Sequence, residues 1–168
     1  MKMIHNFGKT ILAIVTLLIC VFSANAEILP ETLKVAKDGK VEAYLLGSSS
    51  HDFVTSFTVN FEDESTTEVP RPAFLKNTAE VGTKLDLGTH IEGSQLILVA
   101  KVQDTGHWFY SKKEFNVDKD KHFIIHQIYM EDGTPALIIR FEESLGLGDA
   151  DYNDQVVLLV NAVVERHY

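Results

Sequence analysis

Cysteine is almost absent from this sequence. Cys20 is the only one among 168 residues, and it lies inside the hydrophobic N-terminal stretch. A chain with one cysteine cannot form an internal disulfide, and removal of the N-terminal stretch would leave no thiol at all. We therefore expect packing, or a bound ion, to stabilise the remaining fold.

Long apolar runs are absent as well. The longest, Ile11–Phe22, is broken only by Thr16 and spans ~18 Å as a helix, well short of a ~30 Å hydrocarbon core. Lys2 and Lys9 precede this run, and the small-x-small tripeptide Ala24-Asn25-Ala26 follows it. This order predicts a cleavable signal peptide over residues 1–26 and a secreted or periplasmic protein, with no membrane span after cleavage.

Cleavage before Glu27 would leave residues 27–168 as the functional part. A lipidated Cys20 is the alternative, but Leu18 and Ile19 stand where a lipoprotein signal has small residues. The remaining 142 residues are enough for one domain with a sizeable core and hardly enough for two.

Positive charge is scarce in that part, which has 13 Lys and Arg residues against 24 Asp and Glu residues, a formal net charge of −11. Such a charge argues against nucleic acid or an anionic membrane as a partner. It suits cation binding, although solubility alone accounts for most of it.

Helical periodicity is rare, and alternation of apolar and polar residues replaces it. Phe53, Thr55, Phe57, Val59 and Phe61 share one face of a strand. Further strands are predicted over residues 41–46, 96–102, 122–130, 136–141 and 155–165, three of them with continuous apolar runs typical of central strands. The pattern predicts an all-β fold, an antiparallel β-sandwich or jelly roll, with Phe57 and Phe61 in its core.

One acidic segment concentrates hard oxygen ligands. Asp149, Asp151 and Asn153 occupy positions 1, 3 and 5 of a D-x-D-x-N loop, and Asp154 follows. This spacing lets alternate side chains converge on one cation, and oxygen-only ligands favour calcium. An acidic turn without metal is the alternative, since Asp and Asn are ordinary turn residues.

The loop is not an EF-hand, because Asp154 replaces the glycine of position 6 and Val160 replaces the glutamate of position 12. Further ligands must come from elsewhere in the chain. Glu142 and Glu143 are the nearest candidates, since they face Asp154 if the strands over 136–141 and 155–165 form a hairpin.

The segment Phe141-Glu142-Glu143, followed by GDADYNDQVV over residues 148–157, resembles the hallmark of the bacterial domain of unknown function 4114. The family occurs in secreted and surface proteins, including large adhesins. The resemblance extends over most of residues 27–168. It implies a β-sandwich whose acids bind calcium, although the family's acids have also been interpreted as catalytic. Glu143, Ala150 and Leu147 depart from the pattern, which has Asp, Arg and Gly there.

The remaining candidates are weaker. His122 and His126 lie ~13 Å apart on a strand, so we expect exposed histidines rather than a zinc site. Trp108 and Tyr110 share a strand face, which we expect to be core; a sugar-stacking platform is the alternative.

Three functions follow from these features. The first is a calcium-binding β-sandwich that binds or adheres to glycans or a surface partner rather than catalysing a reaction. The second is a secreted polysaccharide hydrolase that uses Glu142, Glu143 or the Asp cluster. The third is a purely structural calcium domain.

Overall fold

The computed structural model describes residues 32–48, 55–61, 74–75 and 79–165. These residues form an all-β fold with two short 3₁₀ turns, η1 (Lys113–Phe115) and η2 (Leu145–Leu147). The strands are β1 (Thr32–Val35), β2 (Gly39–Gly47), β3 (Thr55–Phe61), β4 (Phe74–Leu75), β5 (Lys84–His90), β6 (Gln95–Val102), β7 (Trp108–Tyr110), β8 (Phe123–Tyr129), β9 (Pro135–Phe141), β10 (Gln155–Val160) and β11 (Ala162–Glu165).

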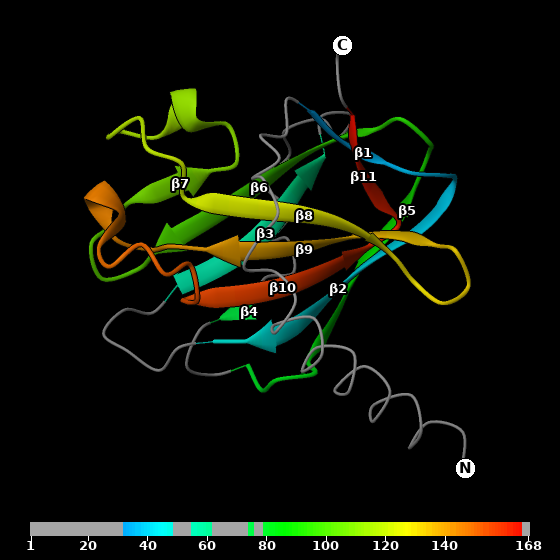
Figure 1. The fold of residues 1–168 in the computed structure, drawn as a ribbon, viewed down its shortest axis with the longest axis horizontal. Helices are drawn as coiled ribbons and strands as arrows, with labels where there is room; N and C mark the ends of the chain where they lie inside the picture. The colour runs from blue at the N-terminus through cyan, green and yellow to red at the C-terminus, as the bar shows by residue number, and fades with distance from the viewer. Residues whose placement is uncertain (1–31, 49–54, 62–73, 76–78, 166–168) are drawn as a thin grey trace.

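The strands build two antiparallel sheets that face each other. One has the order β11-β1-β6-β3-β4, with β7 paired to the same edge of β6 as β1, and the other has the order β5-β2-β10-β9-β8. In Figure 1 the second sheet lies in front, and β3 and β6 cross behind it. Phe57 of the first sheet packs on Phe123 of the second, with ring centroids 6.3 Å apart. The predicted antiparallel β-sandwich is confirmed.

The core follows from alternation along the strands. Phe57, Val59 and Phe61 of β3 are 1%, 2% and 5% exposed, which confirms that they share the buried face; Phe53 lies outside the described residues. The strands with continuous apolar runs, β6, β9 and β10, each have a neighbour on both edges. Their central position agrees with the prediction, because strands covered on both faces tolerate apolar residues in succession.

The C-terminal strand differs from its prediction. Residues 155–165 form two strands instead of one, because Asn161 adopts a left-handed backbone with φ of 65°. Its buried side chain donates to the carbonyl oxygens of Lys37 and Lys40 and accepts the N–H of Lys37. The break moves the chain from one sheet to the other, since β10 pairs with β9 and β11 pairs with β1.

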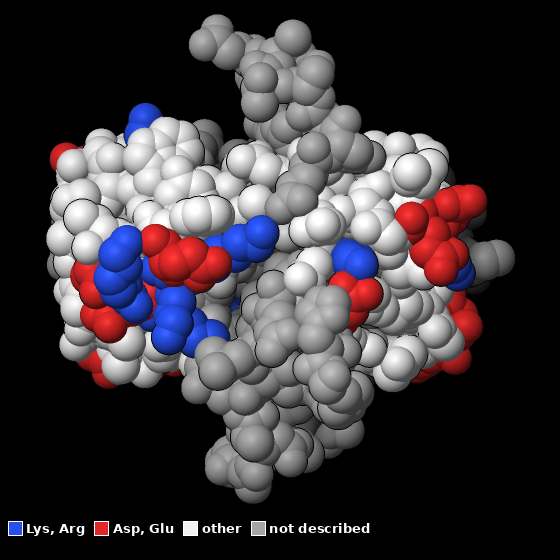
Figure 2. Space-filling model, turned by 90° about the horizontal axis from the view of Figure 1, so that it is seen from above, with Lys and Arg blue, Asp and Glu red and all other residues white. Residues whose placement is uncertain are grey.

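Two observations concern the surface. Figure 2 shows acidic and basic side chains interleaved on the face seen from above, so this face is not uniformly acidic despite the net charge. Among the residues that the structure describes, no helix is long and apolar enough to cross a membrane.

Candidate metal centre

The β9–β10 hairpin positions the acidic segment at one end of the sandwich. The register pairs Phe141 with Gln155 and Arg140 with Val156, as predicted for neighbouring antiparallel strands. Arg140 restrains the part of the connecting loop just before β10. Its Nε donates to the carbonyl oxygen of Tyr152 at 3.1 Å, and its Nη2 donates to that of Asp151 at 2.5 Å.

Three carboxylates converge in this loop. One oxygen each of Glu142, Asp149 and Asp151 lies within 4.8 Å of the other two, close enough for a single metal ion to contact all three. Glu142 is buried, whereas both aspartates are exposed. Carboxylate oxygens are hard donors, so the group suits a hard divalent cation. These are three of the six predicted ligands.

Glu142 is the unusual member of this group. The residue is 2% exposed, and its Oε2 has no hydrogen-bond partner in the described part of the chain, while Oε1 accepts a long 3.4 Å bond from the N–H of Ser144. Burial, followed by the charge of Asp154, raises the pKa of Glu142 to about 7. A buried, unpaired carboxylate oxygen is costly, and a bound cation would offset that cost.

The other predicted residues have different contacts. Asp154 Oδ2 accepts the backbone N–H of Glu143 at 2.8 Å, and Glu143 is itself buried. The backbone N–H of Asn153 donates to Asp151 Oδ1 at 3.0 Å, and the Asn153 amide nitrogen donates to Asp151 Oδ2. These three residues therefore surround the carboxylate group, and Glu143 and Asp154 are not part of it.

The loop conformation is strained. Leu147, Ala150 and Tyr152 have φ values of 65°, 57° and 53°, in the left-handed region that costs a non-glycine residue about 1 kcal/mol or more. Gly148 is required at its position for two reasons. Its φ is 48°, and a Cβ there would lie 2.9 Å from Ser144 Cβ and 3.1 Å from Glu142 Oε1.

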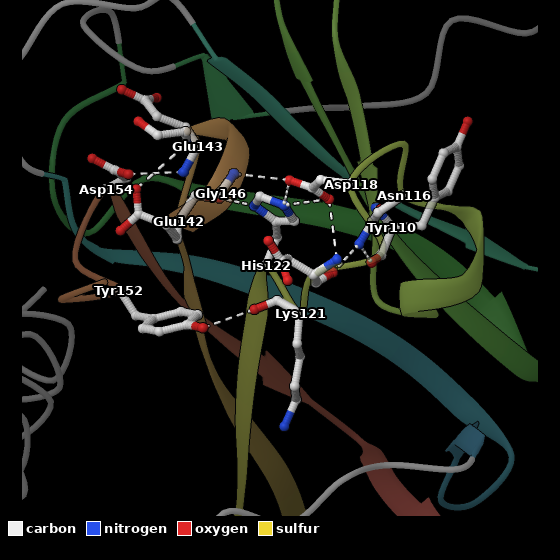
Figure 3. A network of polar contacts seen from close by, with 12 residues as sticks. Tyr110, Asn116, Asp118, Lys121, His122, Glu142, Glu143, Gly146, Tyr152 and Asp154 are labelled. Carbon is white, nitrogen blue, oxygen red and sulfur yellow. Dashed lines mark hydrogen bonds and ion pairs between the residues drawn. The ribbon is translucent and has the colours of Figure 1, made fainter. Parts of the chain in front are cut away.

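A polar network that the sequence did not predict contacts the loop from the segment before β8. His122 lies between two acceptors: its Nδ1 is 2.8 Å from the carbonyl oxygen of Glu142, and its Nε2 is 3.0 Å from Asp118 Oδ2. The same Asp118 oxygen accepts the N–H of Gly146 at 3.0 Å, and the Tyr152 hydroxyl donates to the carbonyl oxygen of Lys121 at 2.8 Å. Figure 3 shows these contacts joining the two segments.

Asp118 is ionised within this network. Burial raises its pKa, but the N–H groups of Gly146 and Asp120 and the His122 ring together outweigh burial and lower the pKa below its ordinary value. The Asp118 carboxylate therefore acts as a fixed acceptor shared by two segments that are far apart in sequence.

The expectation of an exposed His122 is wrong. Strand β8 begins only at Phe123, and the His122 side chain is fully buried, with its ring 4.0 Å from that of Phe109. The hydrogen-bond partners at both ring nitrogens make this burial acceptable. His126 is half-buried on the strand itself.

The expectation for the aromatic strand β7 is also wrong. Phe109 is its fully buried residue, whereas Trp108 is 48% exposed and Tyr110 is half-buried. The face shared by Trp108 and Tyr110 therefore points outward. The Lys101 ammonium lies over the Trp108 ring, 5.0 Å from its centroid.

Comparisons with known proteins add little to this geometry. No family model matches the chain, and no curated protein matches it. Among solved structures, the chain is similar to the C-terminal domain of BC2L-C lectin from Burkholderia cenocepacia, with a TM-score of 0.46 and 16% identity over 80% of this chain and 97% of that chain. A similarity of this size carries no functional argument.

Proposed function

We propose that this protein is an exported calcium-binding β-sandwich that acts as a binding or adhesion-type module. The observation that carries the proposal is the buried Oε2 of Glu142. This atom has no hydrogen-bond partner among the residues that the structure describes, and its carboxylate converges with those of Asp149 and Asp151. Three carboxylates crowded together repel one another, and a divalent cation converts that repulsion into attraction.

Calcium is the ion that the donor set favours. All the candidate ligands are oxygens, and calcium accepts carboxylate, amide and backbone oxygens in irregular arrangements. Magnesium demands nearly ideal octahedral geometry, which a strained loop with left-handed residues provides less readily. The hallmark residues around Glu142 and Asp151 further support relationship to the domain of unknown function 4114 family, which we propose on that sequence pattern.

Calcium dependence of the melting temperature tests the proposal. A ligand at 100 times its dissociation constant stabilises the folded state by ~2.7 kcal/mol. For a domain of this size that corresponds to about 8 to 11 °C. Chelation should lower the melting temperature by roughly this amount, and calcium should restore it better than magnesium does.

Variants of two turn aspartates make this test specific. Asp151→Ala should remove most of the calcium response. Asp132→Ala is the matched control, because Asp132 accepts the N–H of Thr134 in an exposed turn much as Asp151 accepts that of Asn153. Melting curves that stay within about 1 °C under chelation, calcium addition and Asp151→Ala would refute calcium binding.

A glycan is the partner that the outward aromatic face favours. An exposed tryptophan offers an apolar ring on which a sugar can stack, and Lys101 beside Trp108 adds a hydrogen-bond donor. Binding to a glycan array should decrease in Trp108→Ala. The control is Tyr129→Ala, which removes another ring from the surface, since Tyr129 is 69% exposed and lies on β8 of the other sheet. Equal binding by both variants and the parent protein would exclude the Trp108 face.

A polysaccharide hydrolase is the second candidate, and one observation favours it. The pKa of Glu142, raised to about 7 by burial and by Asp154, suits a general acid at neutral pH. Release of reducing ends from polysaccharides by the protein, and its loss in Glu142→Gln, would support hydrolysis over binding.

A further inference from the structure

The segment Asp118–His122 contacts the acidic hairpin at points that bracket the three converging carboxylates. The His122 carbonyl oxygen accepts the N–H of Glu142 at 3.0 Å, and the His122 ring reaches the carbonyl oxygen of the same residue. Asp118 Oδ2 accepts a hydrogen bond from the N–H of Gly146, and the carbonyl oxygen of Lys121 accepts one from the Tyr152 hydroxyl. The contacts at 142, 146 and 152 thus enclose residues 149 and 151.

These contacts restrain a loop that would otherwise relax. Leu147, Ala150 and Tyr152 have left-handed backbones, and such conformations persist only where the surroundings impose them. The segment that makes these contacts is itself fixed to the core, because the His122 ring is fully buried against Phe109 of β7. Asp118 and Lys121 therefore transfer the rigidity of the sandwich to the carboxylate group.

We infer that Asp118 is a positioning residue of the proposed calcium site, and that it sets calcium affinity by holding the hairpin loop in its binding conformation. The inference rests on the proposed function. Asp118 is not one of the three converging carboxylates; it acts through the N–H of Gly146 and through His122. Without it, an incoming ion must order the loop itself, and that cost weakens binding.

Three variants separate positioning from simple charge loss. Asp118→Asn keeps the shape but weakens the contacts that the carboxylate makes with Gly146, Asp120 and His122. Tyr152→Phe removes the hydroxyl bond to Lys121 with no change in charge. Asp120→Asn is the matched control: it removes one negative charge two residues from Asp118, and within the described part of the chain Asp120 contributes only its backbone groups to hydrogen bonds.

Calorimetric titration of the full chain with calcium chloride, well below each melting temperature, measures the effect. We expect Asp118→Asn to raise Kd by roughly 10- to 100-fold, the range found for groups that orient metal ligands. Tyr152→Phe should raise Kd by about fivefold, as the loss of one neutral hydrogen bond would. Asp120→Asn should change it by less than about threefold, because the half-buried Asp120 holds this segment through its backbone groups, which the substitution keeps.

A spectroscopic measurement distinguishes positioning from a general loss of stability. Terbium replaces calcium and is sensitised by tyrosine, and its luminescence lifetimes in H₂O and D₂O report the number of bound waters. Asp118→Asn should increase that number, whereas a variant that only destabilises the fold should lower the melting temperature of the metal-free protein and leave Kd and the lifetimes unchanged.

The possible failures are distinct. If the parent protein binds no calcium, the proposed function and this inference both fall. If the parent binds calcium and Asp118→Asn binds it equally well, only the positioning role is wrong. An equal loss in Asp118→Asn and Asp120→Asn, with none in Tyr152→Phe, would show that charge alone is responsible and would also overturn the inference.

Discussion

Replacement of Glu142 by glutamine should have opposite effects on stability in the absence and in the presence of calcium. Without the ion, the ionised carboxylate is buried, faces the charge of Asp154 and receives no hydrogen bond at Oε2 from any described residue. Glutamine has nearly the same shape and no charge. Glu142→Gln should therefore stabilise the metal-free protein wherever the carboxylate would be ionised.

The pKa of Glu142 sets the size and the pH range of this effect. Burial and Asp154 raise it from an ordinary 4.5 to about 7 in the folded state. Between these values the folded protein holds a proton that the unfolded chain has lost, so the contribution of Glu142 to stability is full below pH 4.5 and is lost as the pH rises through 7. This loss should amount to on the order of 1 to 3 kcal/mol at pH 8, or about 4 to 10 °C in melting temperature.

Scanning calorimetry of the parent protein and Glu142→Gln, at several values between pH 5 and pH 8, is the assay. In metal-free buffer the melting temperature of the variant should exceed that of the parent by more and more as the pH rises. At pH 5 the two melting temperatures should be similar. With calcium at pH 8 the order should reverse, because the variant has lost a ligand. Glu131→Gln, which removes an exposed charge at the opposite hairpin, should show neither effect. A difference between variant and parent that is independent of pH, or unaffected by calcium, would refute the reasoning.

Three other predictions follow from single residues. Gln155 is fully buried, and within the described ranges neither polar atom of its side-chain amide has a hydrogen-bond partner. Gln155→Met should therefore stabilise the protein by about 1 to 3 kcal/mol in urea titrations; a loss of stability would contradict this. Asn161→Ala should cost about 2 to 3 kcal/mol by the same assay, and Asn161→Gly should cost less because glycine accepts the left-handed backbone; equal losses would show that the hydrogen bonds to Lys37 and Lys40 dominate. N-terminal sequencing of the protein from its native host should begin at Glu27, and an intact Met1 or a lipidated Cys20 would overturn export by cleavage.

Much of the fold was predictable because its signals are local. Alternation in β3 places Phe57 and Phe61 in the core, and both are buried. The apolar runs of β9 and β10 predict central strands, and the turn-forming residues between them predict their antiparallel pairing. The two-residue spacing of Asp149 and Asp151 brings their carboxylates together with that of Glu142, because the hairpin returns the chain to the end of β9.

Other features depend on contacts between distant parts of the chain. Trp108 and Phe109 are both large and apolar, and periodicity alone cannot tell which of them faces the opposite sheet. The switch between sheets at Asn161 likewise depends on acceptors at Lys37 and Lys40, which lie more than 120 positions earlier in the chain.

The acidic loop shows why a metal-ligand pattern alone describes only part of such a site. Glycine at positions 146 and 148 is compatible with the left-handed backbone found there. Leu147, Ala150 and Tyr152 adopt the same backbone, although nothing in their residue type predicts it. Their strain has to be offset by groups outside the loop, and Asp118 supplies such a group from 28 positions before Gly146. If positioning by Asp118 sets the affinity, loops with the same acidic pattern and different surroundings should bind calcium with different strength. In the proposed site, the ligand spacing would select the ion, and the segment before β8 would set how tightly it is bound.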